Sequence, residues 1–359
     1  MSLVDLHIHH LRNIEKTRLT LHPHFNLFVG ANGSGKTSLL EAIYLLSTGH
    51  SFRTREISPL ISNNHPSLTV FASTVTEETI SIQKLDTGST RVKLNKQPCS
   101  SSSDLARFLP CQVFYQDIFQ IIDAGPAVRR SLLDWGLFHV KQAYHHLWKD
   151  YRRVLKQRNT LLRKRAPKKE FSPWDDMLVS ISNELHNLRV EYFEVWSASF
   201  QSILEKLTDT PCTIRYYKGW DRKNTGKELS IILNEQFEVD CQRQFTQSGA
   251  HQADICFDVT IHKAKHSLSR GQQKIILIAL KLAQASLLSK TCIYLFDDVS
   301  AELDAVHLQR LFDRLQQIKG QFIFTAIDSI SLPSIINLDI GVFSLDNGEI
   351  STVSRETNT

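Results

Sequence analysis

A glycine-rich segment near the start of the chain has the pattern of a phosphate-binding loop. Its eight residues match the form GxxxxGK[ST]: Gly30, Ala31, Asn32, Gly33, Ser34, Gly35, Lys36 and Thr37. In this pattern backbone N–H groups surround the phosphates, the lysine reaches the β and γ phosphates, and the final hydroxyl can hold Mg²⁺. The sequence therefore predicts a site for ATP and Mg²⁺, with Lys36 as a catalytic cation and Thr37 as a metal ligand.

A pair of acids far along the chain would complete this site. The apolar run 293–296 ends in Asp297 and Asp298, where P-loop proteins place a carboxylate that holds the metal. We expect Asp297 to meet Mg²⁺ through water and Asp298 to orient or activate the attacking water. The alternative is a pair of solvated acids at a strand end, and the phosphate loop in the same chain argues against it.

The segment 267–274 offers a third part of such a site. Ser269 precedes a helical pattern, so it can cap that helix whatever else it does. The segment also resembles the signature loop of the ATP-binding cassette (ABC) superfamily, which contacts the γ-phosphate across a dimer. The resemblance implies two chains with ATP between them, and Ser269, Gly271 and Gln272 acting in trans.

Other elements of that superfamily are less clear. Residues 300–304 resemble its D-loop, while its Q-loop glutamine could be Gln116 or Gln112. The switch histidine is absent, and its region offers only Thr325 and Asp328. Because an Asp stands where the usual catalytic Glu would be, we expect slow hydrolysis, with ATP acting as a clamp more than as a motor.

The elements that flank the loop must hold it in place. Residues 25–29 are apolar and run directly into the glycines, and the apolar positions of 37–46 keep helical spacing. This order predicts a strand, a phosphate loop and a helix. Residues 68–96 alternate between apolar and polar, which predicts an antiparallel β layer.

The middle of the chain has a different character. Helical periodicity spans 144–162 and again 178–195, and Pro167 and Pro173 interrupt the stretch between them. This pattern predicts a helical hairpin. Three further apolar segments suggest strands: 212–217, 229–234 and 255–261.

These elements together define an expected fold class and domain plan. The class is α/β: an ABC-type ATPase head, which is a P-loop NTPase, with an inserted α-helical arm and β layers. We expect a discontinuous ATPase domain from residues 1–115 with 265–359, and an inserted helical, DNA-interaction domain over 116–264.

Composition limits the remaining possibilities. The 359 residues are 42% hydrophobic and 22% charged, as in ordinary globular proteins. No apolar stretch is long enough to cross a bilayer and no secretory signal is readable, so we expect a cytoplasmic protein without a membrane partner. Six cysteines without a CxxC pair favour neither zinc nor disulfides. His7 and His9 share one face of a strand, which indicates plain strand surface more than a metal site.

Positive charge is concentrated in one part of the chain. The formal charge is +5, yet residues 141–169 contain eleven Lys or Arg and a single acid, Asp150. This asymmetry predicts a surface for a polyanion, although a charge run can also be a solvated helix face. The candidates for DNA binding are Lys149, Arg152, Arg153, Lys156 and Arg158.

Over nearly its full length the chain resembles the RecF family, whose ATPases are related to SMC heads. The stretches that carry the resemblance are 11–13, 30–41, 51–53, 125–134, 151–162 and 269–274. It implies ATP-dependent dimerisation on DNA, a preference for duplex and single-strand junctions, weak DNA-dependent ATP hydrolysis, and cooperation with RecO and RecR in loading recombinase at gaps. Two stretches depart from the family pattern: 249–254 lacks an Arg, and Gln116-Asp117 replaces Pro-Glu.

Two alternatives fit the chain less well. An ABC transporter subunit would have its signature nearer the phosphate loop, no basic hairpin, and a membrane partner. An SMC-type structural ATPase would have a far longer coiled coil. The predicted function is therefore an ATP-dependent DNA-binding protein of recombinational repair and replication, in which ATP closes a homodimer on DNA.

Overall fold

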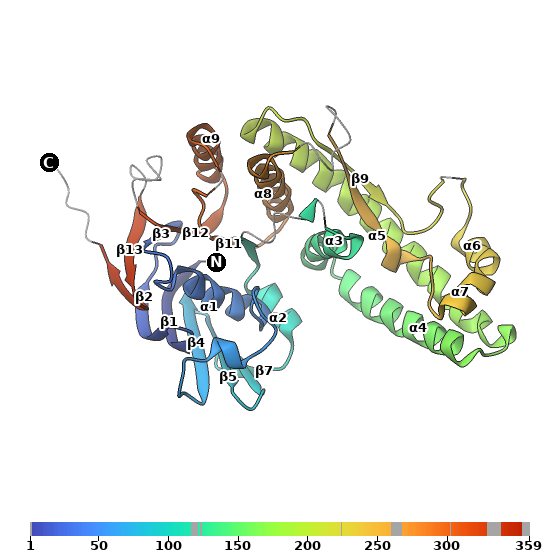
Figure 1. Ribbon diagram of the computed structural model, residues 1–359, viewed down its shortest axis with the longest axis horizontal. Helices are drawn as coiled ribbons and strands as arrows, with labels where there is room; N and C mark the ends of the chain where they lie inside the picture. The colour runs from blue at the N-terminus through green and yellow to red at the C-terminus, as the bar shows by residue number, and fades with distance from the viewer. Residues whose placement is uncertain are drawn as a thin grey trace. The chain divides into compact units, whose positions relative to one another are not determined.

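The chain forms two compact units, which are described separately. The computed structural model describes residues 2–115, 121–122, 124–223, 225–259, 268–301, 303–328 and 339–353. Unit 1 comprises Met1–Phe119 and Leu288–Thr359, and unit 2 comprises Gln120–Leu287. The colour bar of Figure 1 locates both along the chain. No helix in the described ranges combines the length and apolarity that a membrane crossing needs.

The first sheet of unit 1 is mostly parallel. Its order is β14-β13-β3-β12-β11-β8, and only the β13–β14 pair is antiparallel. The strands are β3 (Phe25–Val29), β8 (Cys111–Phe114), β11 (Cys292–Phe296), β12 (Gly320–Ala326), β13 (Ile340–Asp346) and β14 (Glu349–Thr352). Strands β11 and β12 are buried along their whole length, as expected for a parallel sheet covered on both faces. Because β3, β12 and β11 are parallel neighbours, the segments after β3 and β11 meet at one edge.

The second sheet of unit 1 is the antiparallel layer predicted over 68–96. Its order is β2-β1-β4-β5-β6-β7. The strands are β1 (Leu3–Leu11), β2 (Ile14–Thr20), β4 (Ser67–Thr74), β5 (Thr79–Leu85), β6 (Thr90–Leu94) and β7 (Gln97–Cys99). Along β4 and β5 every second residue is buried, so the alternation in the sequence marks the face that packs on the core.

Helix α1 (Lys36–Thr48) joins both sheets into one core. Its apolar residues Leu39 and Ile43 are fully buried in a cluster that also contains Val70 of the antiparallel sheet and Ile293 and Ile323 of the parallel sheet (Figure 1). The helical spacing predicted for 37–46 is confirmed. Shorter helices complete the unit: η1 (Ser58–Leu60), α2 (Ser102–Phe108) and α9 (Ala305–Leu315).

Unit 2 contains the predicted helical hairpin. Helix α4 (Tyr144–Lys164) packs on α5 (Ser172–Leu207), and the chain between them turns through Arg165, which has a left-handed φ of 52°. Strands β9 (Thr213–Tyr217) and β10 (Asp254–Asp258) form an antiparallel pair. The other elements are α3 (Pro126–Val140), η3 (Lys168–Glu170), α6 (Leu229–Glu235), α7 (Phe237–Arg243), η4 (Ala250–Gln252) and α8 (Arg270–Ser286).

One predicted strand is wrong. The segment 229–234 belongs to α6, because Leu229, Ile232 and Leu233 are buried while Ile231 is exposed. The spacing of three and four residues matches one helix face, whereas a strand would bury alternate positions.

Helix α8 belongs to unit 2, although the sequence-based plan grouped residues from 265 onward with the ATPase domain. Its residues Lys274 to Ala285 are all buried. Trp196 of α5 donates a hydrogen bond from Nε1 to the Leu280 oxygen at 3.0 Å, and Gln284 donates to the Leu132 oxygen at 2.7 Å. A helix that is apolar on most faces needs such neighbours on several sides.

A buried arginine fastens the hairpin to the rest of unit 2. Arg158 of α4 is 0% exposed, and its Nη1 lies 2.7 Å from Asp240 Oδ2 and 2.8 Å from Thr246 Oγ1. Its Nε donates to Asp175 of α5 at 2.6 Å. Burial raises the pKa of Asp240, while the bond and charge of Arg158 lower it. The arginine therefore compensates carboxylates that would otherwise lack a counter-charge.

Replacing this arginine tests the buried network. In Arg158→Ala the Asp240 carboxylate loses its cation, so we expect the free energy of unfolding of unit 2 to fall by about 3–5 kcal/mol. Urea unfolding followed by tryptophan fluorescence reports on this unit, because all five tryptophans lie in it: Trp135, Trp148, Trp174, Trp196 and Trp220.

The matched control is Arg152→Ala on the exposed side of the same helix. Its effect should stay within about 0.5 kcal/mol, as for most surface substitutions. Similar small losses in both variants would show that Arg158 contributes nothing to stability.

Candidate nucleotide-binding site

The glycine-rich loop lies between β3 and α1, as predicted, and its glycines are needed where they stand. Gly33 and Gly35 have φ values of 82° and 116°, in the left-handed region. A Cβ on Gly30 would lie 2.3 Å from the Leu345 oxygen, so no other side chain fits without moving the backbone. The loop thus keeps its N–H groups close to whatever it binds.

Lys36 is held against the loop. Its Nζ donates to the Gly30 oxygen at 2.6 Å and to the Ala31 oxygen at 2.9 Å. Burial lowers the pKa of Lys36, and the charges of Asp298 and Asp297 oppose that shift. Ser34 Oγ is enclosed nearby and has no hydrogen-bond partner among the described residues. A cation and an unpaired hydroxyl in one glycine-rich loop suit an anion with several oxygens.

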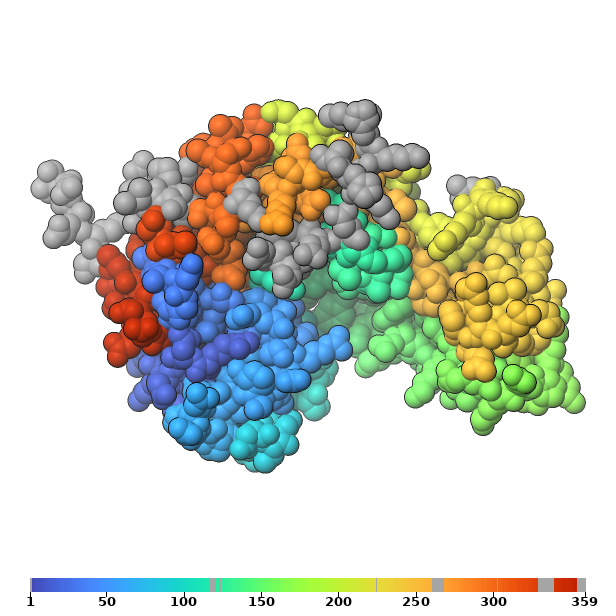
Figure 2. All heavy atoms as spheres, in the orientation of Figure 1, coloured from blue at the N-terminus to red at the C-terminus, as the bar shows by residue number. Residues whose placement is uncertain are grey.

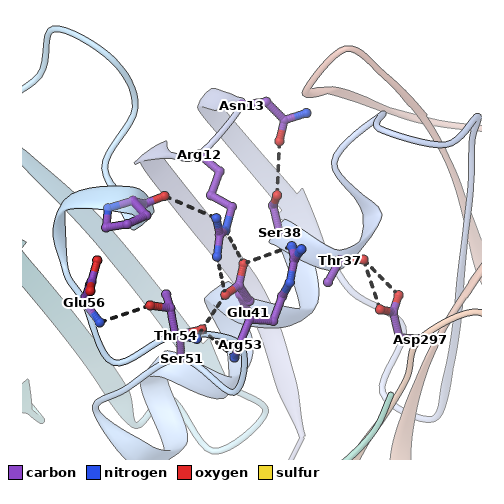
Figure 3. Close-up of polar contacts among 11 residues, drawn as sticks. Arg12, Asn13, Thr37, Ser38, Glu41, Ser51, Arg53, Thr54, Glu56 and Asp297 are labelled. Atoms are coloured by element: carbon purple, nitrogen blue, oxygen red, sulfur yellow. Dashed lines mark hydrogen bonds and ion pairs between the residues drawn. The ribbon is translucent and has the colours of Figure 1, made fainter. Parts of the chain in front are cut away.

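The carboxylate of Asp297 meets the loop from β11. Thr37 Oγ1 lies 3.1 Å from its Oδ1 and 3.0 Å from its Oδ2 (Figure 3), and Thr325 Oγ1 donates to Oδ1 at 3.0 Å. Burial raises the pKa of Asp297, and the bonds from Thr325 and Thr37 lower it. A hydroxyl and a carboxylate side by side are hard oxygen ligands of the kind that Mg²⁺ takes.

Asp298 has a strained backbone beside this carboxylate. Its φ is 49°, which a residue with a side chain rarely adopts. Its N–H donates to Thr325 Oγ1 at 2.8 Å, so one threonine of β12 contacts both acids. Strained residues cluster at functional sites. The sequence singles out Thr325 only because it lies where the switch histidine is expected. No local pattern predicts its hydrogen bonds to Asp297 and Asp298.

The turn of the β1–β2 hairpin, Arg12 and Asn13, braces the phosphate loop by contacts with the loop and with α1. Asn13 donates from Nδ2 to the Gly33 oxygen at 3.2 Å and accepts from Ser38 Oγ at 3.1 Å. Arg12 pairs with Glu41 of α1 through two hydrogen bonds, one of them from Nη2 to Oε1 at 2.9 Å (Figure 3). The Glu41 side chain is 0% exposed, so this charge pair fixes α1 to the hairpin.

A second cation lies near the same carboxylates. Arg53 is 49% exposed, and its Nη1 lies 4.0 Å from Glu41 Oε2. Its charge also contributes to lowering the pKa of Asp297. Ser51 donates to Glu41 Oε1 and accepts from the Arg53 N–H at 2.9 Å, which orients the segment. Residues 51–53 support the family resemblance, but nothing local in the sequence places them at this site.

The signature segment caps α8 within unit 2. Ser269 Oγ accepts from the Gln272 N–H at 3.2 Å, and Gln272 Oε1 accepts from the Ser269 N–H at 2.9 Å, a complete capping box. Gln272 Nε2 also donates to Thr210 Oγ1 at 3.2 Å. The expected cap is confirmed, with Gly271 in the first helical turn; the in-trans role of Ser269, Gly271 and Gln272 stays a prediction.

The structure says less about the residues predicted for the Q-loop and the D-loop. Gln112 is buried as the second residue of β8, and its assignment as the Q-loop glutamine stays a prediction. The other candidate, Gln116, lies outside the described residues, as do Ser267 of the signature segment and Glu302 of the D-loop. Asp304 accepts from the His307 N–H and caps α9.

The basic helix α4 divides into two faces. Lys149, Arg152, Arg153 and Lys156 are exposed and recur at helical spacing, so they share one surface. Figure 2 shows the α4 segment in green at the surface of unit 2. The prediction is wrong for Arg158, because this residue is fully buried among Asp175, Asp240 and Thr246.

The pair of Arg12 and Glu41 can be tested by comparing one substitution with two. Arg12→Ala leaves the buried Glu41 carboxylate short of its cation and should destabilise unit 1 by roughly 2–4 kcal/mol, measured by hydrogen exchange of α1 amides. The double variant Arg12→Met/Glu41→Leu removes both charges and should lose less. If the double variant lost as much as the single variants Arg12→Met and Glu41→Leu together, the ion pair would not link α1 to the hairpin.

Comparison with known proteins identifies the family. The family model described as the RecF/RecN/SMC N terminal domain matches residues 2–351. The DNA replication and repair protein RecF of Cellvibrio japonicus (strain Ueda107) is 38% identical over 342 residues, covering 92% of this chain and 93% of its own length. RecF of Acinetobacter baumannii (strain SDF) is 38% identical over 360 residues, covering 98% and 99%.

Solved structures confirm the fold class. A structure of the recombination mediator protein RecF with ATP, described as part of the RecFOR pathway, has a TM-score of 0.83 at 23% identity and covers 98% of both chains. An SMC head bound to the C-winged helix domain of ScpA has a TM-score of 0.63 at 19% identity, covering 99% of this chain and 98% of its own. The expected α/β ATPase head with an inserted helical arm is confirmed, and the chain belongs to the RecF family of DNA replication and repair proteins.

Proposed function

We propose that this chain binds ATP with Mg²⁺ at the Gly30–Thr37 loop. The observation that carries the proposal is the meeting of Lys36, Thr37 and Asp297, from segments far apart in sequence, at one edge of the parallel sheet. Lys36 binds phosphate oxygens, and Thr37 and Asp297 supply oxygen ligands. When bound, Mg²⁺ neutralises charge on the β and γ phosphates. The similar RecF protein whose structure was solved with ATP supports this assignment.

Hydrolysis at this site is slow in our proposal. Asp298 orients the attacking water and accepts its proton, and its N–H bond to Thr325 fixes the backbone that carries it. Because the Asp side chain is shorter than the usual Glu, its carboxylate lies farther from the attacking water. ATP then acts mainly as a switch, and hydrolysis resets it.

In this proposal, ATP binding converts the monomer into a homodimer. Ser269, Gly271 and Gln272 of one chain contact the nucleotide held by Lys36 of the other. The capping box fixes Ser269 and Gln272 at the start of α8, where the positive end of the helix dipole favours an anion. The same surface on both chains is used, as in most symmetric dimers.

The dimer holds DNA through its basic helix. The four exposed cations of α4 neutralise phosphates without reading bases, which suits a protein that acts at junctions and gaps of any sequence. A similar RecF structure is described as belonging to the RecFOR pathway. On that basis we extend to this chain cooperation with RecO and RecR in loading recombinase.

Dimerisation should depend on ATP and on Lys36. Analytical ultracentrifugation of the wild type with ATP and Mg²⁺ should give a dimer, and Lys36→Ala should remain a monomer because the phosphates lose their cation. Lys93→Ala, an exposed lysine of β6, is the control and should dimerise normally. Equal dimerisation of all three chains would exclude the nucleotide sandwich.

DNA binding should weaken steeply with salt. For the wild type the logarithm of the affinity should fall linearly with the logarithm of salt concentration, by about 0.9 per phosphate contacted. Arg152→Glu/Arg153→Glu should bind more weakly, with a slope shallower by roughly 2, measured by fluorescence anisotropy on gapped, duplex and single-stranded DNA.

A matched charge reversal on unit 1 shows whether the loss of DNA binding comes from lost contacts of α4 or from the change in net charge. Arg91→Glu/Lys93→Glu changes two exposed cations of β6 by the same amount. If it weakened binding as much as the α4 variant, the DNA site would not be on α4.

A further inference from the structure

Three potential metal ligands of unit 1 converge beside the hairpin that braces the phosphate loop. His10 is the penultimate residue of β1, Glu15 is the second residue of β2, and His65 lies in the segment before β4. Their ligand atoms all lie within 4.8 Å of one another. Glu15 Oε2 lies 3.6 Å from His10 Nδ1 and 3.4 Å from His65 Nε2.

The two separations from Glu15 Oε2 are close to the spacing of ligands around one small cation. Zn²⁺ binds imidazole nitrogen and carboxylate oxygen at about 2.0–2.2 Å, so ligands at tetrahedral angles lie roughly 3.3–3.5 Å apart. The two imidazole rings are stacked with their centroids 3.6 Å apart. A shared ion requires the rings to open toward it, and His65 has room for that rotation because its side chain is 31% exposed.

One nitrogen of the cluster lacks a conventional partner. His10 Nδ1 is enclosed, and among the described residues it has no hydrogen-bond partner. Glu15 is 71% exposed, so an ion pair between it and a histidine would contribute little stability by itself. An enclosed imidazole nitrogen facing a carboxylate and a second imidazole is the donor set of a metal site with three protein ligands.

The backbone holds the three segments together without the side chains, since β1 pairs with β2 through Leu11 opposite Ile14 and also contacts the 62–65 segment. The Ser62 N–H donates to the His10 oxygen at 2.9 Å, and the His65 N–H donates to the Ser62 oxygen at 3.3 Å. His10 itself has a φ of 55°, in the left-handed region. The ligands are therefore brought together before any ion arrives, which lowers the entropy lost on binding.

We propose that His10, Glu15 and His65 form a binding site for one divalent transition-metal ion of the Zn²⁺ class, with a water in the open position. The ion fastens β1, β2 and the 62–65 segment at the stem of the hairpin. The turn of that hairpin, Arg12 and Asn13, contacts Glu41 and Gly33. Metal binding thus stabilises the brace of the phosphate loop, and the site stands whether or not the loop binds ATP.

Binding of metal by the untagged full chain tests the site. Equilibrium dialysis against Zn²⁺ should show one tight equivalent in the wild type. Glu15→Gln and His65→Gln should each weaken that equivalent at least tenfold, whereas His50→Gln, an exposed histidine of the same unit, should keep it. The chain has 15 histidines and six cysteines, so equal binding by all four chains would show an adventitious ion only and overturn the proposal.

A gain of signal distinguishes direct ligation from a folding defect. In Glu15→Cys a thiolate replaces the carboxylate, and Co²⁺ should give a new near-ultraviolet thiolate charge-transfer band. Lys16→Cys, at the adjacent exposed position, should give none. A band of equal strength in both variants, or in neither while both chains remain folded by circular dichroism, would exclude Glu15 as a ligand.

Discussion

The phosphate loop depends on partners that come from outside it. A loop that keeps N–H groups available for an anion makes few internal bonds, here Ser34 N–H to the Ala31 oxygen at 3.2 Å, so other segments must fix its shape. Gly30 N–H donates to the Ala326 oxygen at 3.2 Å, the Ser34 oxygen accepts from the Gly348 N–H at 2.8 Å, and Asn13 holds the Gly33 oxygen. Three distant parts of the chain thus converge on one short segment.

Buried charge makes this arrangement rigid. Glu41 is fully buried on α1 and is matched by Arg12, so moving the hairpin away would leave a carboxylate in the core without a cation. Asp297 and Lys36 are in the opposite situation, since burial shifts the pKa of each toward its neutral form. A ligand that brings both phosphate and a divalent cation satisfies both groups at once. The supporting residues Arg12 and Glu41 therefore neutralise each other, whereas the charges of Lys36 and Asp297 favour binding of a ligand.

Local sequence patterns predict those parts of the site that are formed by neighbouring residues. The phosphate loop, the apolar strand before Asp297 and the cap at Ser269 each need only a few adjacent residues. Arg12, Glu41, Arg53 and Thr325 cannot be found in this way, because each acts through a partner far away in the sequence. The same limit applies to the histidines: the sequence singles out the same-face pair His7 and His9, whereas the structure brings His10 to His65 of another segment.

The basic run of α4 shows why a count of charges predicts a surface only in part. Lys149, Arg152, Arg153 and Lys156 fall on one helical face, but Arg158 is two positions beyond Lys156 and so points about 200° away from it. That opposite face packs on α5 and α7, where Asp175 and Asp240 neutralise the guanidinium. The run therefore combines an exposed cationic face, on which Arg153 also pairs with Asp150, with the buried anchor Arg158. Because the anchor joins α4 to two other helices, the exposed cations stand on a stiff support, which would lower the entropy lost in the polyanion binding that we propose for them.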